Sequence, residues 1–162
     1  MIAFEKKSAD VIVNSQKTLK SADNLMKAVM PAANEPRILL KVLEILYKEE
    51  ISLISFILKY EHVCKRVKLG KDNVKNLKVF FDKCIFNYGL DKKDRDNLRM
   101  ILILGKKHRQ SGFEFVKHRK IIILDDDLNV NEVDNQMIEG FISSLKKLVD
   151  GMYNKIYERN NN

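Results

Sequence analysis

Two short basic clusters, each containing a histidine, hold the side chains in this sequence best suited to chemistry. The first cluster is Lys106, Lys107, His108 and Arg109, and the second is Lys117, His118, Arg119 and Lys120. Lysine and arginine neutralise phosphate or carboxylate groups, and histidine exchanges a proton near neutral pH. If the chain folds back between the clusters, they form one positive patch. We expect such a patch to bind RNA or an acidic protein partner, with an affinity that falls as salt rises.

Two adjacent carboxylates, Glu49 and Glu50, interrupt a long apolar stretch. Both fall off the polar line of the helix predicted there, so at least one of them faces other helices or marks a bend. A buried, unpaired carboxylate is costly, and we therefore expect a Lys or Arg of a neighbouring helix beside it. Use as a buried functional acid is the alternative.

Residues that bind metals or cofactors do not occur at the spacing that such sites require. No Glu-x-x-His pair is present for a bundle metal site, and His62 and Cys64 diverge on a helix. Asp125 to Asp127 lack the spacing of a calcium loop and indicate a turn. No phosphate-binding glycine loop or nucleophile elbow appears. We predict no metal, no cofactor and no catalytic residue.

The element that must position these side chains is a central helix over residues 37–66. Its polar residues recur with a mean step close to the helical 3.6, and most positions between them are apolar. The polar line comprises Arg37, Lys41, Glu44, Lys48, Ser52, Ser55, Lys59, His62 and Arg66. A helix with so narrow a polar stripe must be covered on most sides, which places it at the centre of a bundle.

The remaining segments predict a single, mainly α domain of about five helices. Further helices are expected over residues 8–30, ended by Pro31, over 73–88, ended by Gly89, and over 95–109. Apolar and polar residues alternate within residues 113–130, which predicts a small β-hairpin with the Asp cluster in its turn. A last helix is expected to begin near Asn131 or Asp134. Residues 1–7 and 160–162 are expected to fray.

The charge of the chain is unevenly distributed. The net charge is +8, but residues 59–120 hold 18 Lys or Arg against 7 Asp or Glu. Such a field attracts a polyanion or an acidic partner, although lysine-rich solvated helix faces give the same count. The longest apolar stretch, residues 51–58, is far shorter than the roughly 20 residues of a membrane span. Two cysteines form no disulfide framework, so a reduced, cytoplasmic protein is expected.

A helical hairpin core, a further basic helix and a long final helix together resemble the HEPN superfamily of small helical bundles. The resemblance implies a ribonuclease or a nucleotide-binding partner. Residues 21–24, Pro31, residues 36–40 and residues 120–124 before a final helix are similar to uncharacterised archaeal helical proteins of about this size. The HEPN signature, an Arg followed by His four to six residues later, is absent: Arg99 precedes His108 by nine positions, and Arg109 precedes His118 by nine.

Three functions follow from these patterns. The first is a non-enzymatic binding or assembly module whose basic middle meets RNA or an acidic partner. The second is a divergent HEPN-type ribonuclease that uses His108 or His118 with a nearby arginine. The third is a purely structural homodimer formed through apolar faces, and it is partly compatible with the first.

Overall fold

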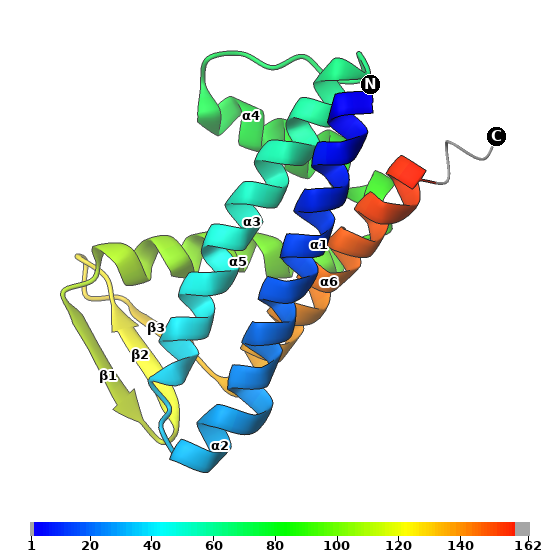
Figure 1. The fold of residues 1–162 in the computed structure, drawn as a ribbon. Coiled ribbons are helices and arrows are strands. Elements are labelled where there is room, and N and C mark those ends of the chain that lie inside the picture. The colour runs from blue at the N-terminus through cyan, green and yellow to red at the C-terminus, as the bar shows by residue number, and fades with distance from the viewer. Residues whose placement is uncertain (1, 158–162) are drawn as a thin grey trace.

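The computed structural model describes residues 2–157 and is mainly helical, with one small sheet before the last helix (Figure 1). The expected fraying at residues 160–162 lies outside the described residues. The elements in chain order are α1 (Ile2–Asn24), η1 (Leu25–Val29), α2 (Met30–Ala33), α3 (Ile38–Val63), α4 (Asn73–Val79), η2 (Phe80–Cys84), η3 (Ile85–Tyr88), α5 (Lys92–Gln110), β1 (Phe113–Lys117), β2 (Lys120–Leu124), β3 (Val130–Val133) and α6 (Asn135–Tyr157). This order confirms the predicted fold class.

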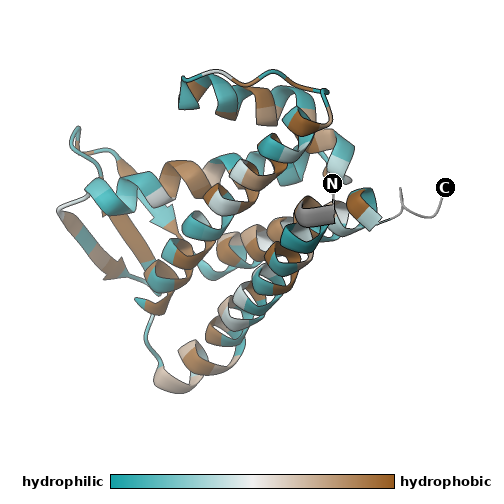
Figure 2. Cartoon of the chain, turned by 45° about the horizontal axis from the view of Figure 1, so that its top comes forward, coloured by the Kyte–Doolittle hydropathy of each residue, from teal (hydrophilic) through white to brown (hydrophobic). Residues whose placement is uncertain are grey.

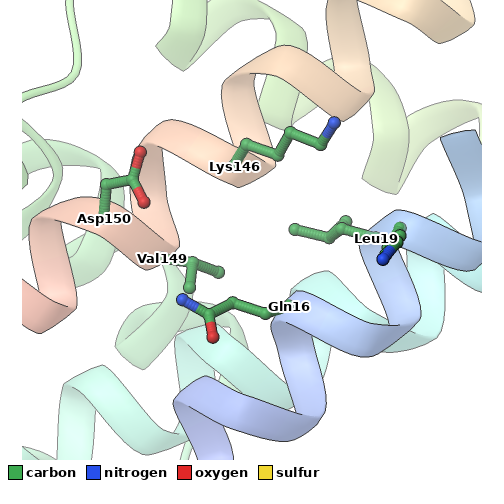
Figure 3. Close-up of a pocket in the computed structure, with 6 residues that line it drawn as sticks. Gln16, Leu19, Lys146, Val149 and Asp150 are labelled. Atoms are coloured by element: carbon green, nitrogen blue, oxygen red, sulfur yellow. The ribbon is translucent and has the colours of Figure 1, made fainter.

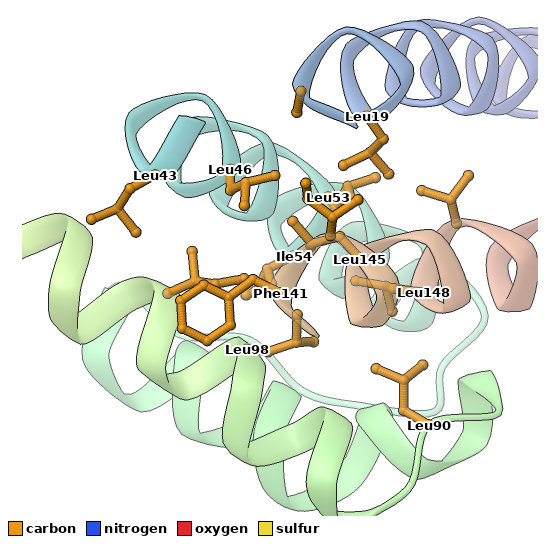
Figure 4. Close-up of a cluster of buried hydrophobic side chains, with 14 of the residues drawn as sticks. Leu19, Leu43, Leu46, Leu53, Ile54, Leu90, Leu98, Phe141, Leu145 and Leu148 are labelled. Carbon is orange, nitrogen blue, oxygen red and sulfur yellow. The ribbon is translucent and has the colours of Figure 1, made fainter. Parts of the chain in front are cut away.

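Helix α3 is the central helix that its polar stripe predicts. It packs against α1, α5 and α6, and its inward side chains are fully buried (Figure 1). Figure 4 shows them meeting side chains of the other three helices and Leu90, which precedes α5; the other labelled residues are Leu19, Leu43, Leu46, Leu53, Ile54, Leu98, Phe141, Leu145 and Leu148. Each helix combines hydrophobic with hydrophilic residues along its length, as amphipathic helices do (Figure 2).

The first helical segment is longer at both ends than predicted. Helix α1 begins at Ile2 rather than near Ser8, and the fraying expected for residues 1–7 stays a prediction. Pro31 does not end the helix: it lies in α2, which follows directly after the π-helical turn η1, and the helical segment continues to Ala33. The chain leaves the helix only at Asn34, which adopts the left-handed conformation with φ of 49°.

The helix predicted over residues 73–88 forms three pieces with different windings. Asp72 caps α4 by accepting hydrogen bonds from the backbone N–H groups of Val74 and Lys75. The π-helical turn η2 and the 3-10 turn η3 follow, and Gly89 ends the segment with φ of +80° as predicted. Helix α5 begins at Lys92, three residues early, because Asp91 and Asp94 form a reciprocal capping box.

The predicted hairpin is a three-stranded antiparallel sheet in the order β1-β2-β3. His118 and Arg119, with φ of 51° and 62°, form the two-residue turn between β1 and β2. The Asp cluster therefore lies in the second turn, between β2 and β3, and not in the first. Asp134 then caps α6 by accepting a hydrogen bond of 2.9 Å from the N–H of Met137, which confirms the predicted start.

Candidate functional site

The two basic clusters lie at opposite ends of the β1–β2 hairpin. The first cluster ends α5, close to the start of β1, whereas Lys117 pairs with Lys120 beside the turn at the far end. A five-residue strand separates these points by about 13 Å. Arg119 at the hairpin turn instead lines a small cavity with α2 residues Met30 and Pro31. The fold thus does not unite the clusters into the single patch that we expected.

Most side chains of the first cluster connect α5 to the rest of the molecule. The Lys107 ammonium donates to the side-chain oxygen of Asn131 at 2.8 Å and lies 3.5 Å from an Asp125 carboxylate oxygen. His108 Nδ1 lies 2.9 Å from the Glu114 carboxylate. The Arg109 guanidinium stacks on the Tyr47 ring, 4.9 Å from its centroid. Lys106 and Arg109 are both exposed and lie outside the ion pairs of the described residues, and only Arg109 has a ring beneath its charge.

The second cluster is exposed and has a structural role at the turn. His118 and Arg119 form that turn, and Lys120 pairs with Glu132 at 3.6 Å. His108 and His118 consequently share no site. The ribonuclease reading stays a prediction that this geometry does not support, and RNA binding by either cluster alone also stays a prediction.

The two central glutamates have different environments. Glu49 is half-buried, and its carboxylate accepts a hydrogen bond of 2.5 Å from the Ser15 hydroxyl of α1. Glu50 is completely buried, and neither of its carboxylate oxygens has a hydrogen-bond partner among the described residues. The expected basic partner of Glu50 is therefore wrong. Burial instead raises the pKa of Glu50 well above its usual value, so the neutral acid replaces an ion pair.

A third buried carboxylate, Glu61, escaped the sequence prediction. It accepts hydrogen bonds from Arg66, from the Tyr88 hydroxyl at 2.5 Å and from Lys155 of α6, whose ammonium lies at 2.9 Å. Burial by itself would raise the pKa of Glu61, but these donors outweigh it and lower the pKa to about 2. With every partner supplied by the chain itself, this cluster connects α3, η3 and α6 and serves stability.

A groove of about 500 Å³ lies on the side of α3 that faces α4 and α5. Its lining is mainly aliphatic and comprises Tyr47, Ile51, Ile54, Ser55, Leu58, Lys59, Leu69, Asn73, Asn76, Leu77, Leu102 and Lys106. In Figure 1 α3 runs across both α4 and α5, and six of the lining residues, from Tyr47 to Lys59, come from α3. We call α3 the floor of the groove and α4 and α5 its walls. Ile51 is 45% exposed within it. The volume suits a binding site for an apolar group.

Two lysines border this groove without a carboxylate of their own. Lys59 and Lys106 are exposed, and neither takes part in an ion pair with a described residue. The sequence prediction included Lys106 but missed the groove. Its one local signal was Ile51, an apolar residue beside the polar stripe, because the walls come from segments distant in sequence.

Two further cavities are smaller than this groove. One of about 230 Å³ lies between α1 and α6, where Gln16 and Leu19 face Lys146, Val149 and Asp150 (Figure 3). Lys146 there already pairs with Asp23 at 3.3 Å. Within residues 2–157 no group of three or more His, Cys, Asp or Glu side chains is arranged to hold a metal ion. No helix in the same range combines the length and hydropathy needed to cross a bilayer.

Comparisons of this chain with protein-family models, with curated proteins and with solved structures found no match. The resemblance to HEPN bundles accordingly stays a prediction.

Proposed function

We propose that this chain is a non-enzymatic binding module that holds an acidic protein partner at the groove between α3, α4 and α5. The observation that carries the proposal is the combination of a mainly aliphatic groove with two exposed lysines that have no internal carboxylate. Apolar contact supplies the free energy of binding, and the lysines select a partner of opposite charge.

The lining favours a protein over RNA. Single-stranded nucleic acid binds on exposed aromatic rings that stack on bases, beside a row of cations that follows the phosphates. The groove contains a single aromatic residue, Tyr47, and Arg109 covers its ring. Aliphatic residues such as Ile51 and Leu102 offer contact area to side chains rather than to bases.

The proposal is tested by measuring the binding of labelled polyglutamate and of a labelled RNA homopolymer at low and at physiological salt. The double variant Lys59→Glu with Lys106→Glu should weaken polyglutamate binding at least about tenfold, since two attractive charges become repulsive. The matched control is Lys7→Glu with Lys17→Glu, which makes the same change of charge at two exposed positions of α1 and should change binding by less than about twofold.

Equal losses in the two double variants would show that only net charge matters and would contradict the proposal. Tighter binding of RNA than of polyglutamate, unchanged by Lys59→Glu with Lys106→Glu, would favour RNA binding elsewhere on the chain.

A further inference from the structure

We infer that the groove receives an amphipathic α-helix of about three turns with an acidic residue near each end. This inference rests on the proposed function and specifies the shape of the partner segment. It goes beyond charge attraction, because it requires a particular secondary structure and a particular spacing of the acids.

The floor of the groove sets the length of the segment. Tyr47, Ile51, Ile54 and Leu58 follow one another on α3 in steps of four, three and four residues, so they form one apolar stripe. The eleven steps from Tyr47 to Leu58, at a rise of 1.5 Å each, give a stripe of about 16 Å, which is three helical turns. A partner helix of the same length covers the stripe with side chains at matching helical spacing.

The walls determine that the segment is helical. Each wall is a helix, whose backbone groups bond to one another and present no strand edge to an incoming chain. An extended segment would bury its own N–H and C=O groups against aliphatic side chains without partners, at a cost that a helix avoids. The side-chain amide of Asn76 offers little help, since it already donates to and accepts from the backbone of Gly70.

The two lysines lie toward opposite ends of the stripe. Lys59 follows Leu58 directly in α3. Lys106 follows Gly105, which lies so close to the Tyr47 ring that an added Cβ would overlap it. Acidic side chains about three turns apart on the partner can therefore pair with both lysines at once.

The groove is formed before any partner arrives. Asp72 caps α4, and the paired hydrogen bonds between Asn76 and Gly70, each 3.0 Å, hold the preceding loop against it. A wall that is already ordered reduces the conformational entropy lost on binding.

The test uses fluorescence anisotropy with two labelled peptides of about 13 residues and identical composition. In one peptide leucines form a helical stripe between terminal glutamates, and in the other the order is scrambled. The decisive variant is Ser55→Arg, which fills the groove while adding a positive charge at an exposed position of its lining. The matched control is Ser21→Arg, at an exposed position of α1.

The ordered peptide should bind at least about tenfold more tightly than the scrambled one. Ser55→Arg should remove that preference and leave polyglutamate binding intact or stronger, whereas Ser21→Arg should keep the preference. Thermal unfolding monitored by circular dichroism checks that both variants fold. If Ser55→Arg does not fold, Ile51→Lys replaces it, with Val13→Lys on α1 as the control at similar exposure, 45% against 47%.

The possible outcomes separate this inference from the proposed function. Equal binding of the two peptides, with polyglutamate binding still sensitive to Lys59→Glu and Lys106→Glu, overturns the helix and leaves the acidic partner. Absence of binding by both peptides and by polyglutamate overturns both. Displacement of the ordered peptide by a long-chain fatty carboxylate or by RNA, each at lower concentration than the unlabelled peptide, also overturns the helix.

Discussion

Glu50 shows how a single carboxyl group can occupy the middle of an apolar core. It lies on the buried face of α3 between Leu46 and Leu53, with no exposed surface and no hydrogen bond to a described residue. Ionisation there would leave a charge without a partner, which costs far more than holding the proton. The folded protein therefore keeps this acid neutral at a pH where the unfolded chain releases the proton.

This difference predicts a specific dependence of stability on pH. At every pH between 4.5, the ordinary value for a glutamate, and its raised pKa, Glu50 is more fully protonated in the folded state than in the unfolded chain. The contribution of Glu50 to the free energy of unfolding is therefore fully present below pH 4.5 and is lost as pH rises through the raised pKa. In urea unfolding, the free energy of unfolding of the natural chain should therefore contain this decrease with rising pH, and that of Glu50→Gln should lack it.

Glu50→Leu provides the companion measurement, because leucine removes both the proton and the unpaired polar atoms. It should raise the free energy of unfolding at pH 7 by about 1–3 kcal/mol. If Glu50→Leu raises the free energy of unfolding but Glu50→Gln keeps the pH dependence of the natural chain, another group titrates in this range.

At the scale of elements, α6 packs closely on η3 because Gly151 has no side chain. A Cβ at position 151 would overlap the backbone carbonyl of Tyr88, which cannot move as a side chain could. The same region holds the hydrogen bond between the Tyr88 hydroxyl and Glu61, and the Lys155 ammonium lies 4.3 Å from the centre of the Tyr88 ring. The approach of the two backbones thus positions the buried carboxylate cluster.

Gly151→Ala should accordingly lower the free energy of unfolding by about 1–3 kcal/mol or more, since the helix must move away from η3. Gly140→Ala, on the same helix, is the matched control. An added Cβ there meets only the Asn97 amide nitrogen at 3.5 Å, an ordinary contact, and alanine favours the helix by up to about 1 kcal/mol. Equal effects of the two substitutions in thermal or urea unfolding would refute the close approach.

At the scale of the whole molecule, topology separates charges that are close in sequence. Only seven residues lie between Arg109 and Lys117, yet they include a strand, which places the second cluster at the far end of the hairpin. Lys106 in turn borders a groove whose other lysine, Lys59, comes from α3. The positive field of residues 59–120 is thus distributed over several surfaces.

Two separate clusters should act independently on any polyanion. Reversal of Lys106 and Lys107 to glutamate, and reversal of Lys117 and Lys120, should weaken binding to heparin or RNA by free energies that add within about 0.5 kcal/mol in the combined variant. Binding titrations of the four proteins at one salt concentration measure this. Strong non-additivity would mean that one ligand bridges the clusters as a single site.

The sequence by itself determined the helices and where several of them begin or end. The polar stripe of α3, the cap at Asp134 and the left-handed Gly89 are local features, because periodicity and capping depend on residues within one or two turns. It also marked Glu49 and Glu50 as exceptions on α3. The hairpin turn escaped because His118 and Arg119 lack the usual Asn-Gly signal of a two-residue turn.

The tertiary structure alone decided which exceptions are buried and which cations share a surface. Glu50 has no hydrogen-bond partner within residues 2–157, whereas Glu61 gains Tyr88 and Lys155 as partners because η3 and α6 pack on α3. The groove exists because residues of α4 and α5 come together beside one stripe of α3. Such contacts depend on the relative placement of whole elements, and no periodicity within a single segment records that placement.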